Sequence, residues 1–147
     1  MKENKRIRAM WDDLPKTIDY LVDKHNLDGE NKPDFIIGMS RGGLIPAAMI
    51  ATKINVPLVA AYIDKHDHLY VDKQDWLWDK NILIVDDICR TGWTLSKAYR
   101  LVKKITDGFV TTLTMYNLVE ENQKKDINPD FSNTTRTDIK FPWDYDR

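Results

Sequence analysis

Two adjacent acids and a threonine-rich turn follow one of the most apolar runs in the sequence. Asp86 and Asp87 come directly after Ile82-Leu83-Ile84-Val85, and Thr91-Gly92-Trp93-Thr94 follows them closely. Hydroxyls and free backbone N–H groups at the start of a helix favour a phosphate, because the helix dipole is positive there. The two carboxylates can accept hydrogen bonds from vicinal hydroxyls, or hold Mg²⁺ directly or through water. This pattern predicts a phosphate cradle with a sugar beside it.

A second polar turn, Ser40-Arg41-Gly42-Gly43, follows the short apolar run Phe35-Ile36-Ile37-Gly38. Its glycines permit a tight turn with exposed N–H groups, and Arg41 adds a forked donor suited to an anionic, oxygen-rich group. Taken alone, the turn is equally typical of an ordinary strand-to-helix connection. In an open α/β sheet, however, ligands bind beyond the carboxyl ends of the strands. We therefore expect the two turns to form one site.

Alternating strands and helices must position these turns. The predicted helices cover residues 14–26, 44–54 and 95–105, and the predicted strands cover residues 35–38, 57–63, 82–85 and 109–118. The run 82–85 is continuous and β-branched, which is typical of a strand buried on both faces of a parallel sheet. The pattern predicts an α/β fold with a central, mainly parallel sheet flanked by helices.

Two stretches lie outside this alternation. Residues 64–81 are polar and contain Trp76 and Trp78, which predicts a long loop; the two indoles either close over a substrate or anchor the loop to the core. His66 and His68 in this loop are better explained by a polar, solvated segment than by a metal site. From residue 119 onward the chain is polar and irregular, so we expect a tail that caps one end of the sheet without adding to it.

The composition excludes several classes of protein. The 147 residues fit one domain, 1–147, and 22 basic against 23 acidic residues argue against a nucleic-acid partner. No run is long enough to span a membrane and no signal peptide is recognisable, so we expect a cytoplasmic protein without a membrane partner. Cys89 is the only cysteine and cannot form an internal disulfide. Neither a Walker A loop nor a GxGxxG fingerprint occurs.

The run ILIVDDICRTGWT resembles the phosphoribosyl diphosphate (PRPP) binding motif of type I phosphoribosyltransferases. Over nearly the whole chain, the resemblance extends to the xanthine-guanine (6-oxopurine) phosphoribosyltransferases. MWDDLPKTIDYL is similar to their opening helix, MSRGGLIPAAMIA to their pyrophosphate loop and helix, and Pro142-Trp143-Asp144 to their closing motif. The resemblance implies the type I phosphoribosyltransferase fold with a mobile loop at 64–81, a small C-terminal hood at 119–147, and a homo-oligomer, either dimer or tetramer.

The reaction implied by the resemblance is purine salvage: transfer of ribose 5-phosphate from PRPP to guanine, xanthine or hypoxanthine, with release of pyrophosphate and Mg²⁺ as cofactor. The residues expected to bind PRPP and its phosphates are Ser40, Arg41, Gly42, Asp86, Asp87, Thr91, Gly92, Trp93 and Thr94. The expected catalytic residues are Arg41, Asp86, Asp87 and Arg90, and the expected metal ligands, direct or through water, are Asp86 and Asp87. Breaking the glycosidic bond builds positive charge on ribose and negative charge on pyrophosphate, which such groups stabilise.

The base side departs from the family pattern. Purine-specific relatives commonly carry an Asp that accepts a proton from the base where this sequence has Arg90, which cannot be a general base but can donate to O6 and N7 of guanine. A family lysine that contacts the 6-oxo group falls near Met115, and a stacking aromatic residue falls near Asp138. The residues expected near the base are Arg90, Met115, Tyr116, Ile139 and Trp143.

Two alternatives stay open because of this rewritten base side. The first is a regulatory protein that binds PRPP or a nucleotide without catalysis. The second is a transferase that keeps the reaction but accepts a pyrimidine or an unusual base.

Overall fold

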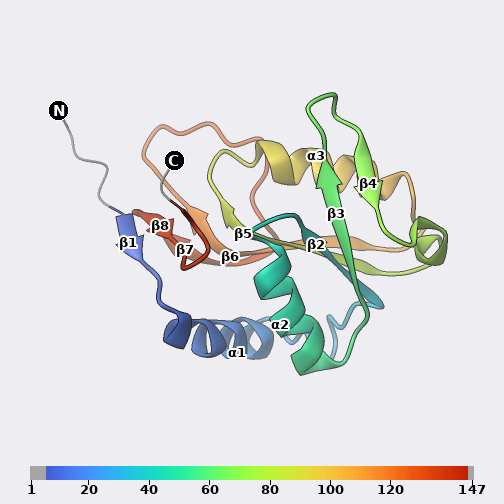
Figure 1. Cartoon of the computed structure of the whole chain (residues 1–147), viewed down its shortest axis with the longest axis horizontal. Coiled ribbons are helices and arrows are strands. Elements are labelled where there is room, and N and C mark those ends of the chain that lie inside the picture. Colours follow the sequence, from blue (N-terminus) through green and yellow to red (C-terminus); the bar gives the residue numbers. More distant parts are fainter. Residues whose placement is uncertain (1–5, 146–147) are drawn as a thin grey trace.

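The computed structural model describes residues 6–145, and a six-stranded sheet forms the centre of this part of the chain. The strands lie in the order β4 (Leu69–Val71), β3 (Leu58–Ile63), β2 (Phe35–Met39), β5 (Ile82–Cys89), β6 (Val110–Leu118) and β7 (Phe131–Thr135) (Figure 1). All neighbouring strands are parallel except β4, which pairs antiparallel with β3. The predicted α/β class with a mainly parallel sheet is confirmed.

The register of β2 against β5 brings the two polar turns to one edge. Gly38 pairs with Val85, so the residues that follow each of them leave the sheet side by side. The strand β5 lies between β2 and β6, and its first four residues are buried, as expected for a central strand. Because parallel strands end at the same edge, both turns lie where an α/β sheet binds its ligands.

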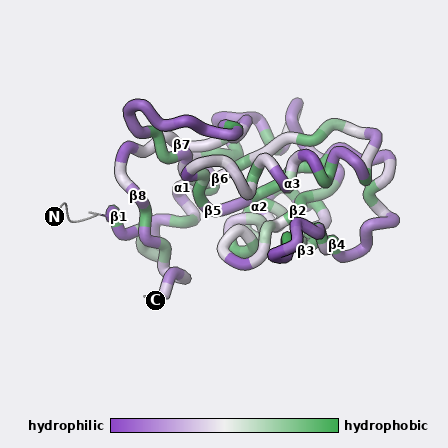
Figure 2. Tube along the Cα trace, turned by 90° about the horizontal axis from the view of Figure 1, so that it is seen from above, coloured by the Kyte–Doolittle hydropathy of each residue, from purple (hydrophilic) through white to green (hydrophobic). Residues whose placement is uncertain are grey.

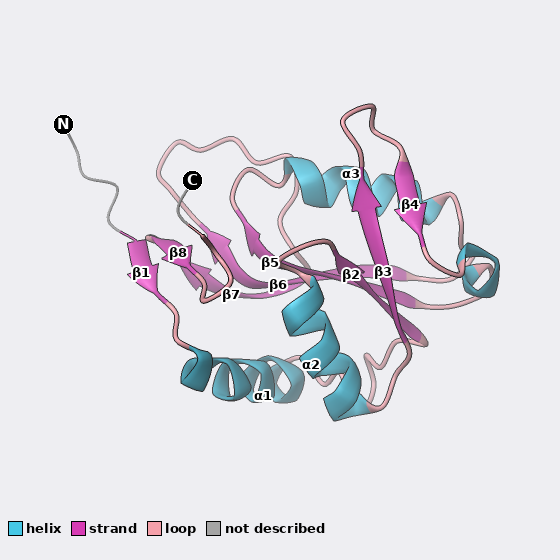
Figure 3. Ribbon diagram, viewed as in Figure 1, coloured by secondary structure: helices cyan, strands magenta, loops and turns pink. Residues whose placement is uncertain are grey.

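Helices cover both faces of the sheet. α1 (Leu14–Lys24) and α2 (Leu44–Ile54) lie on one face, and α3 (Trp93–Lys103) lies on the other (Figure 3). Strand side chains alternate between the two cores: Ile36 packs with α1 and α2, whereas Ile37 packs with α3. This alternation explains why β2 and β5 read as continuous apolar runs.

The predicted elements differ from the observed ones at their ends. β5 continues beyond residue 85 to Cys89, because Asp86, Ile88 and Cys89 still pair with β6. The two acids therefore belong to the strand itself and do not follow it. α3 starts at Trp93, two residues before the predicted helix, so Trp93 and Thr94 belong to its first turn.

Two predictions about irregular segments are corrected by pairing between strands. The segment 64–81 contains β4, which forms a hairpin with β3 and stacks Tyr70 on Tyr62. The segment after residue 119 does not only cap the sheet, since Phe131–Thr135 adds β7 beside β6. The connection between β6 and β7 is mostly hydrophilic (Figure 2). Neither β4 nor β7 shows a strong alternation of apolar residues. Both become strands by pairing with a neighbouring strand, and their own residues give little signal of this.

A small parallel pair, β1 (Arg6–Arg8) and β8 (Asp138–Lys140), lies beside β7 at one end of the molecule; we call it the terminal sheet (Figure 1). A third core cluster lies beneath it and consists of Ala9, Leu14, Ile88, Met115, Ile139 and Phe141. The outer limits of the predicted domain 1–147 and hood 119–147 fall in residues 1–5 and 146–147, outside the described part. Among the helices of residues 6–145, none has the length and apolar character needed to span a membrane.

Candidate functional site

The turn after β2, residues 40–43, packs directly against the end of β5. A methyl group added to Gly43 would lie 2.7 Å from the carbonyl oxygens of both Met39 and Val85, so this position has no room for a side chain. The peptide bond between Ser40 and Arg41 is cis. The β2 turn and β5 therefore form one continuous surface, as the sequence predicts.

Gly42 brings this turn against the second acid of β5. A methyl group on Gly42 would overlap Asp87 Oδ2 and lie 2.9 Å from Trp143 Nε1. The Trp143 indole N–H donates a hydrogen bond of 3.0 Å to the same Asp87 oxygen. Asp87 is thus held between the β2 turn and the C-terminal segment, and three distant parts of the chain meet at its carboxylate.

The two acids differ in their surroundings. Asp86 Oδ1 accepts a hydrogen bond from the Asp87 backbone N–H (2.9 Å), and Asp87 Oδ1 accepts one from the Ile88 N–H (2.8 Å). Part of Asp86 reaches solvent, yet protein atoms surround its carboxyl. Burial, followed by the negative charge of Asp87, raises the pKa of Asp86 well above the usual carboxyl range. A cation bound nearby would restore the ionised form.

The turn between β5 and α3, residues 90–92, forms the third side of the site. Gly92 has a φ of 83°, and a methyl group there would overlap the carbonyl oxygen of Ile127, so glycine is required at this position. Thr91 Oγ1 accepts a hydrogen bond of 3.2 Å from the Trp93 N–H. The turn lies at the N-terminus of α3 and opens on a cavity of about 330 Å³ lined by residues 86–95. Such an arrangement suits a phosphate.

Residues 123–127 support the β5 turn from behind, a role that no pattern in the sequence predicted. Lys125 Nζ donates to the carbonyl of Cys89 (3.3 Å) and to that of Arg90. Gln123 Nε2 also donates to the Arg90 carbonyl (3.1 Å), and the Asp126 N–H donates to the Thr91 carbonyl (2.9 Å). This polar stretch carries no recognisable motif, and only the fold shows that it holds the turn.

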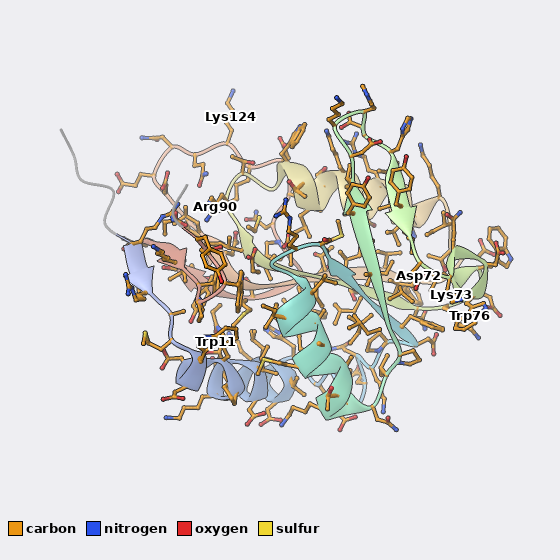
Figure 4. The ribbon with its side chains drawn as sticks, viewed as in Figure 1. Trp11, Asp72, Lys73, Trp76, Arg90 and Lys124 are labelled. Carbon is orange, nitrogen blue, oxygen red and sulfur yellow. The ribbon has the colours of Figure 1, made fainter. Side chains whose placement is uncertain are left out.

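The residues expected near the base include Arg90, which forms an ion pair that the sequence did not predict. Arg90 Nε donates to Asp138 Oδ1 (3.1 Å), and Arg6 Nε lies 3.1 Å from Asp138 Oδ2. Arg90 lies at the end of β5 on the side of the terminal sheet (Figure 4). The opposite charges at 90 and 138, both departures from the family pattern, were the available signal that these two residues face each other.

The other residues predicted near the base lie at different depths. Met115 and Ile139 are 1% and 2% exposed and belong to the third core cluster, so their side chains lie beneath the site. Tyr116 and Trp143 are partly exposed, and the Trp143 ring stacks on Phe141 with centroids 4.7 Å apart. The structure places Trp143 at the site through its hydrogen bond to Asp87, and base binding by all four of these residues stays a prediction.

The segment 64–81 contacts α3 through its hairpin tip. Lys97 of α3 pairs with Asp67, and its ammonium lies 3.2 Å from the centroid of the Trp93 ring. Trp76 lies at the opposite end of the molecule from Arg90 (Figure 4) and is exposed, as is Trp78. The two indoles therefore do not anchor the segment to the core, a role that the buried Leu77 between them takes. Their closure over a substrate stays a prediction.

The comparison that decides the family is a match of residues 10–147 to the family model described as the phosphoribosyl transferase domain. The chain belongs to this family. The family predicted from the sequence is thereby confirmed, and so is the enzyme class at the level of the family, the pentosyltransferases. The roles of individual residues are not tested by this match.

Relatives of this phosphoribosyltransferase differ in the base that their names state. It is 28% identical to a xanthine-guanine phosphoribosyltransferase of Idiomarina loihiensis, over 96% of this chain and 88% of the relative. It is also 28% identical to an orotate phosphoribosyltransferase of Sulfurisphaera tokodaii, over 82% of this chain but only 61% of the relative. A solved purine phosphoribosyltransferase of Pyrococcus horikoshii has a TM-score of 0.80 and 29% identity, covering 97% of this chain and 95% of that one.

Proposed function

We propose that this phosphoribosyltransferase transfers ribose 5-phosphate from PRPP to a 6-oxopurine and releases pyrophosphate. One observation carries the proposal: the β2 turn, the acids of β5 and the N-terminus of α3 meet at a single edge of the sheet, with Gly42 packed against Asp87. Such an edge offers anion-binding backbone groups on two sides of a pair of carboxylates. That is the set of groups a sugar with phosphates at both ends requires.

Each part of PRPP has matching groups at this edge. The 5-phosphate binds at the N-terminus of α3, residues 91–94, where backbone N–H groups and hydroxyls face the cavity. The ribose hydroxyls bind to Asp86 and Asp87. The pyrophosphate binds to the β2 turn, where Ser40, Gly42 and the Arg41 fork supply donors.

The donor set of the site fits Mg²⁺ shared with the substrate. Asp86 and Asp87 supply carboxylate oxygens, and Mg²⁺ commonly takes one or two carboxylates together with substrate phosphates. Within residues 6–145, no cluster of three or more acids, histidines or cysteines forms a metal site of its own. When bound, the ion supplies positive charge that neutralises the departing pyrophosphate.

The side chains then stabilise a transition state in which charge separates. The ribose becomes cationic as its bond to pyrophosphate breaks, and Asp87, fixed by Trp143 and the β2 turn, keeps a negative charge close to it. Arg41 and the backbone N–H groups of the β2 turn face the oxygens that gain negative charge. Because these groups are held before the reaction begins, little reorganisation is needed when charge develops.

Two observations support a 6-oxopurine as the acceptor. The xanthine-guanine relative matches almost the whole of this chain, whereas the orotate relative extends well beyond the match. Arg90 also lines the cavity and offers donors, which suit the O6 and N7 acceptors of such a base.

The proposal is tested by measuring pyrophosphate release and nucleotide mass with PRPP, Mg²⁺ and one base at a time. Hypoxanthine, guanine, xanthine, adenine and orotate are compared, with Asp87→Asn as the inactive reference. We expect turnover with at least one of the three 6-oxopurines. Turnover with orotate or adenine alone would transfer the proposal to that base, and binding of PRPP without any turnover would favour the regulatory alternative.

A further inference from the structure

We infer that Arg90, oriented by Asp138, determines which base the site accepts, and that it selects a purine with an acceptor at position 6 over one with an amino group there. The inference rests on the proposed function, since it assigns the base side of that same site. It makes Arg90 the specificity-determining residue and Asp138 a positioning residue.

The main chain of Arg90 is fixed from below. Its carbonyl accepts hydrogen bonds from both Lys125 Nζ and Gln123 Nε2, and the next carbonyl, that of Thr91, accepts one from the Asp126 N–H. A turn of this kind is usually the most variable part of a strand-to-helix connection. Here three donors from one segment hold it, so the point from which the Arg90 side chain leaves the backbone is well defined.

The side chain of Arg90 is fixed through one nitrogen only. Nε donates to Asp138 Oδ1, which also accepts the Ile139 N–H at 3.0 Å. The other oxygen of Asp138 pairs with Arg6, so both carboxylate oxygens are engaged. Within residues 6–145, the two terminal nitrogens of Arg90 have no hydrogen-bond partner, while the side chain is 47% exposed and the residue lines the cavity. Arg90 therefore keeps two free donor groups at the cavity that Asp87 also lines, with its guanidinium fork oriented through Nε.

The Arg90 guanidinium can distinguish purines with an oxo group at position 6 from those with an amino group there. A guanidinium only donates hydrogen bonds, and two of its N–H groups match the O6 and N7 acceptors of a 6-oxopurine. Adenine carries an amino group at position 6, so the N–H groups of Arg90 and of this amino group would face each other without an acceptor. A polar site built for one partner rejects the analogue that leaves its groups unpaired much more strongly than an apolar site does.

The same fork determines where the proton goes. With an N–H of Arg90 donated to it, N7 keeps its lone pair, so the ring proton of the reacting base is on N9. Loss of the N9 proton to water frees the electron pair with which N9 forms the bond to C1′ of ribose, as the bond from C1′ to the pyrophosphate oxygen breaks. Arg90 takes no proton at any stage, in keeping with its pKa above about 12.

The test compares hypoxanthine with adenine, which differ in whether position 6 carries an oxo or an amino group. The measured quantity is the ratio of kcat/KM for the two bases in the wild-type chain and in Arg90→Gln. A glutamine amide pairs with N6 and N7 of adenine, so we expect the ratio to fall about tenfold or more. Arg90→Lys keeps the charge without the fork, and its ratio is expected to fall as well.

Variants of the ion-pair partners distinguish an effect on the orientation of Arg90 from a general effect on folding. Asp138→Asn removes the charge of the ion pair and so weakens the hold on the fork, and we expect the ratio to fall about threefold to fivefold, mainly through the KM for hypoxanthine. Arg6→Gln is the matched control: it removes the other partner of Asp138 by the same kind of substitution, and we expect its ratio to stay within about twofold of wild type. Melting temperatures of all variants monitor the fold.

Affinities for the product nucleotides IMP and AMP, measured by calorimetry, supply a second readout that needs no turnover. If no base is turned over, the proposed function fails, and the ratio of these affinities in Arg90→Gln and wild type still decides the inference. Equal ratios in the two proteins, in turnover or in binding, would overturn it.

Discussion

The two sides of the site are built by different kinds of interaction. On the side of the strand-end turns, glycines lie against backbone or carboxylate oxygens, and any added methyl group would overlap them, as at Gly42 and Gly92. On the side of the terminal sheet, half-exposed ion pairs such as Arg90 with Asp138 hold the surface together. Close packing accepts few residue types, whereas an exposed ion pair can be exchanged for another at small cost. We therefore expect the side of the strand-end turns, which we call the phosphate side, to tolerate few substitutions. The side of the terminal sheet, the base side, is expected to tolerate more.

Gly42→Ala gives the strongest test of the close packing on the phosphate side. The new methyl group would displace the Asp87 carboxylate, and a shift of about 1 Å in such a group can reduce kcat/KM about 100-fold. Pyrophosphate release measures the effect. Gly29→Ala is the control, because the three atoms nearest to its methyl group all belong to the end of the Asn26 side chain, which can rotate away. Full activity of Gly42→Ala would show that the packing is not required.

A substitution behind the turn tests whether the support segment matters. Lys125→Met leaves the carbonyls of Cys89 and Arg90 without their ammonium donor, which costs about 1–3 kcal/mol for partly buried groups. We expect kcat/KM for PRPP to fall about 30-fold. Lys124→Met is the matched control, since this neighbouring side chain is exposed and points away from the site (Figure 4). Equal effects of the two substitutions would contradict a supporting role.

The sequence predicts best what depends on neighbouring residues. The run 82–85 and the helix 44–54 are recognisable because apolar side chains recur at one spacing, and both are observed. β7 was missed because its residues are mostly polar and become a strand only by pairing with β6. The same reason applies to Arg90 with Asp138 and to Lys125 with the β5 turn, since each joins residues that are far apart in the sequence. Local patterns thus predicted the turns but not what holds them.

One hydrogen bond connects the two sides and can be removed alone. Trp143→Phe removes the indole N–H from Asp87 but preserves an aromatic ring for stacking on Phe141. We expect kcat/KM to fall about fivefold, because a single hydrogen bond typically contributes about 1 kcal/mol net. The comparison variant is Trp11→Phe, because Trp11 lies near the Trp143 ring without a bond to Asp87. An unchanged Trp143→Phe enzyme would mean that the two sides act independently.

The smallest expected effect concerns stability and pH. The folded protein binds the proton of Asp86 more tightly than the unfolded chain does, because its pKa is raised. The free energy of unfolding therefore falls as pH rises from the usual carboxyl range toward that raised pKa. Asp86→Asn removes this slope, and we expect its melting temperature at neutral pH to be about 2–4 °C higher than that of wild type without ligands. A lower melting temperature at every pH would contradict a destabilising carboxylate.

The terminal sheet also affects the order in which the molecule assembles. β1 pairs with β8, and Trp143, just beyond β8, donates to Asp87. β1 is therefore synthesised early but cannot pair until the C-terminal part of the chain has been made. During synthesis, the central sheet from β2 to β6 can form while β1 still has no partner. The base side is then the last part to be completed, because contacts of such long sequence separation form late. A nascent chain would gain the phosphate side before it could distinguish one base from another.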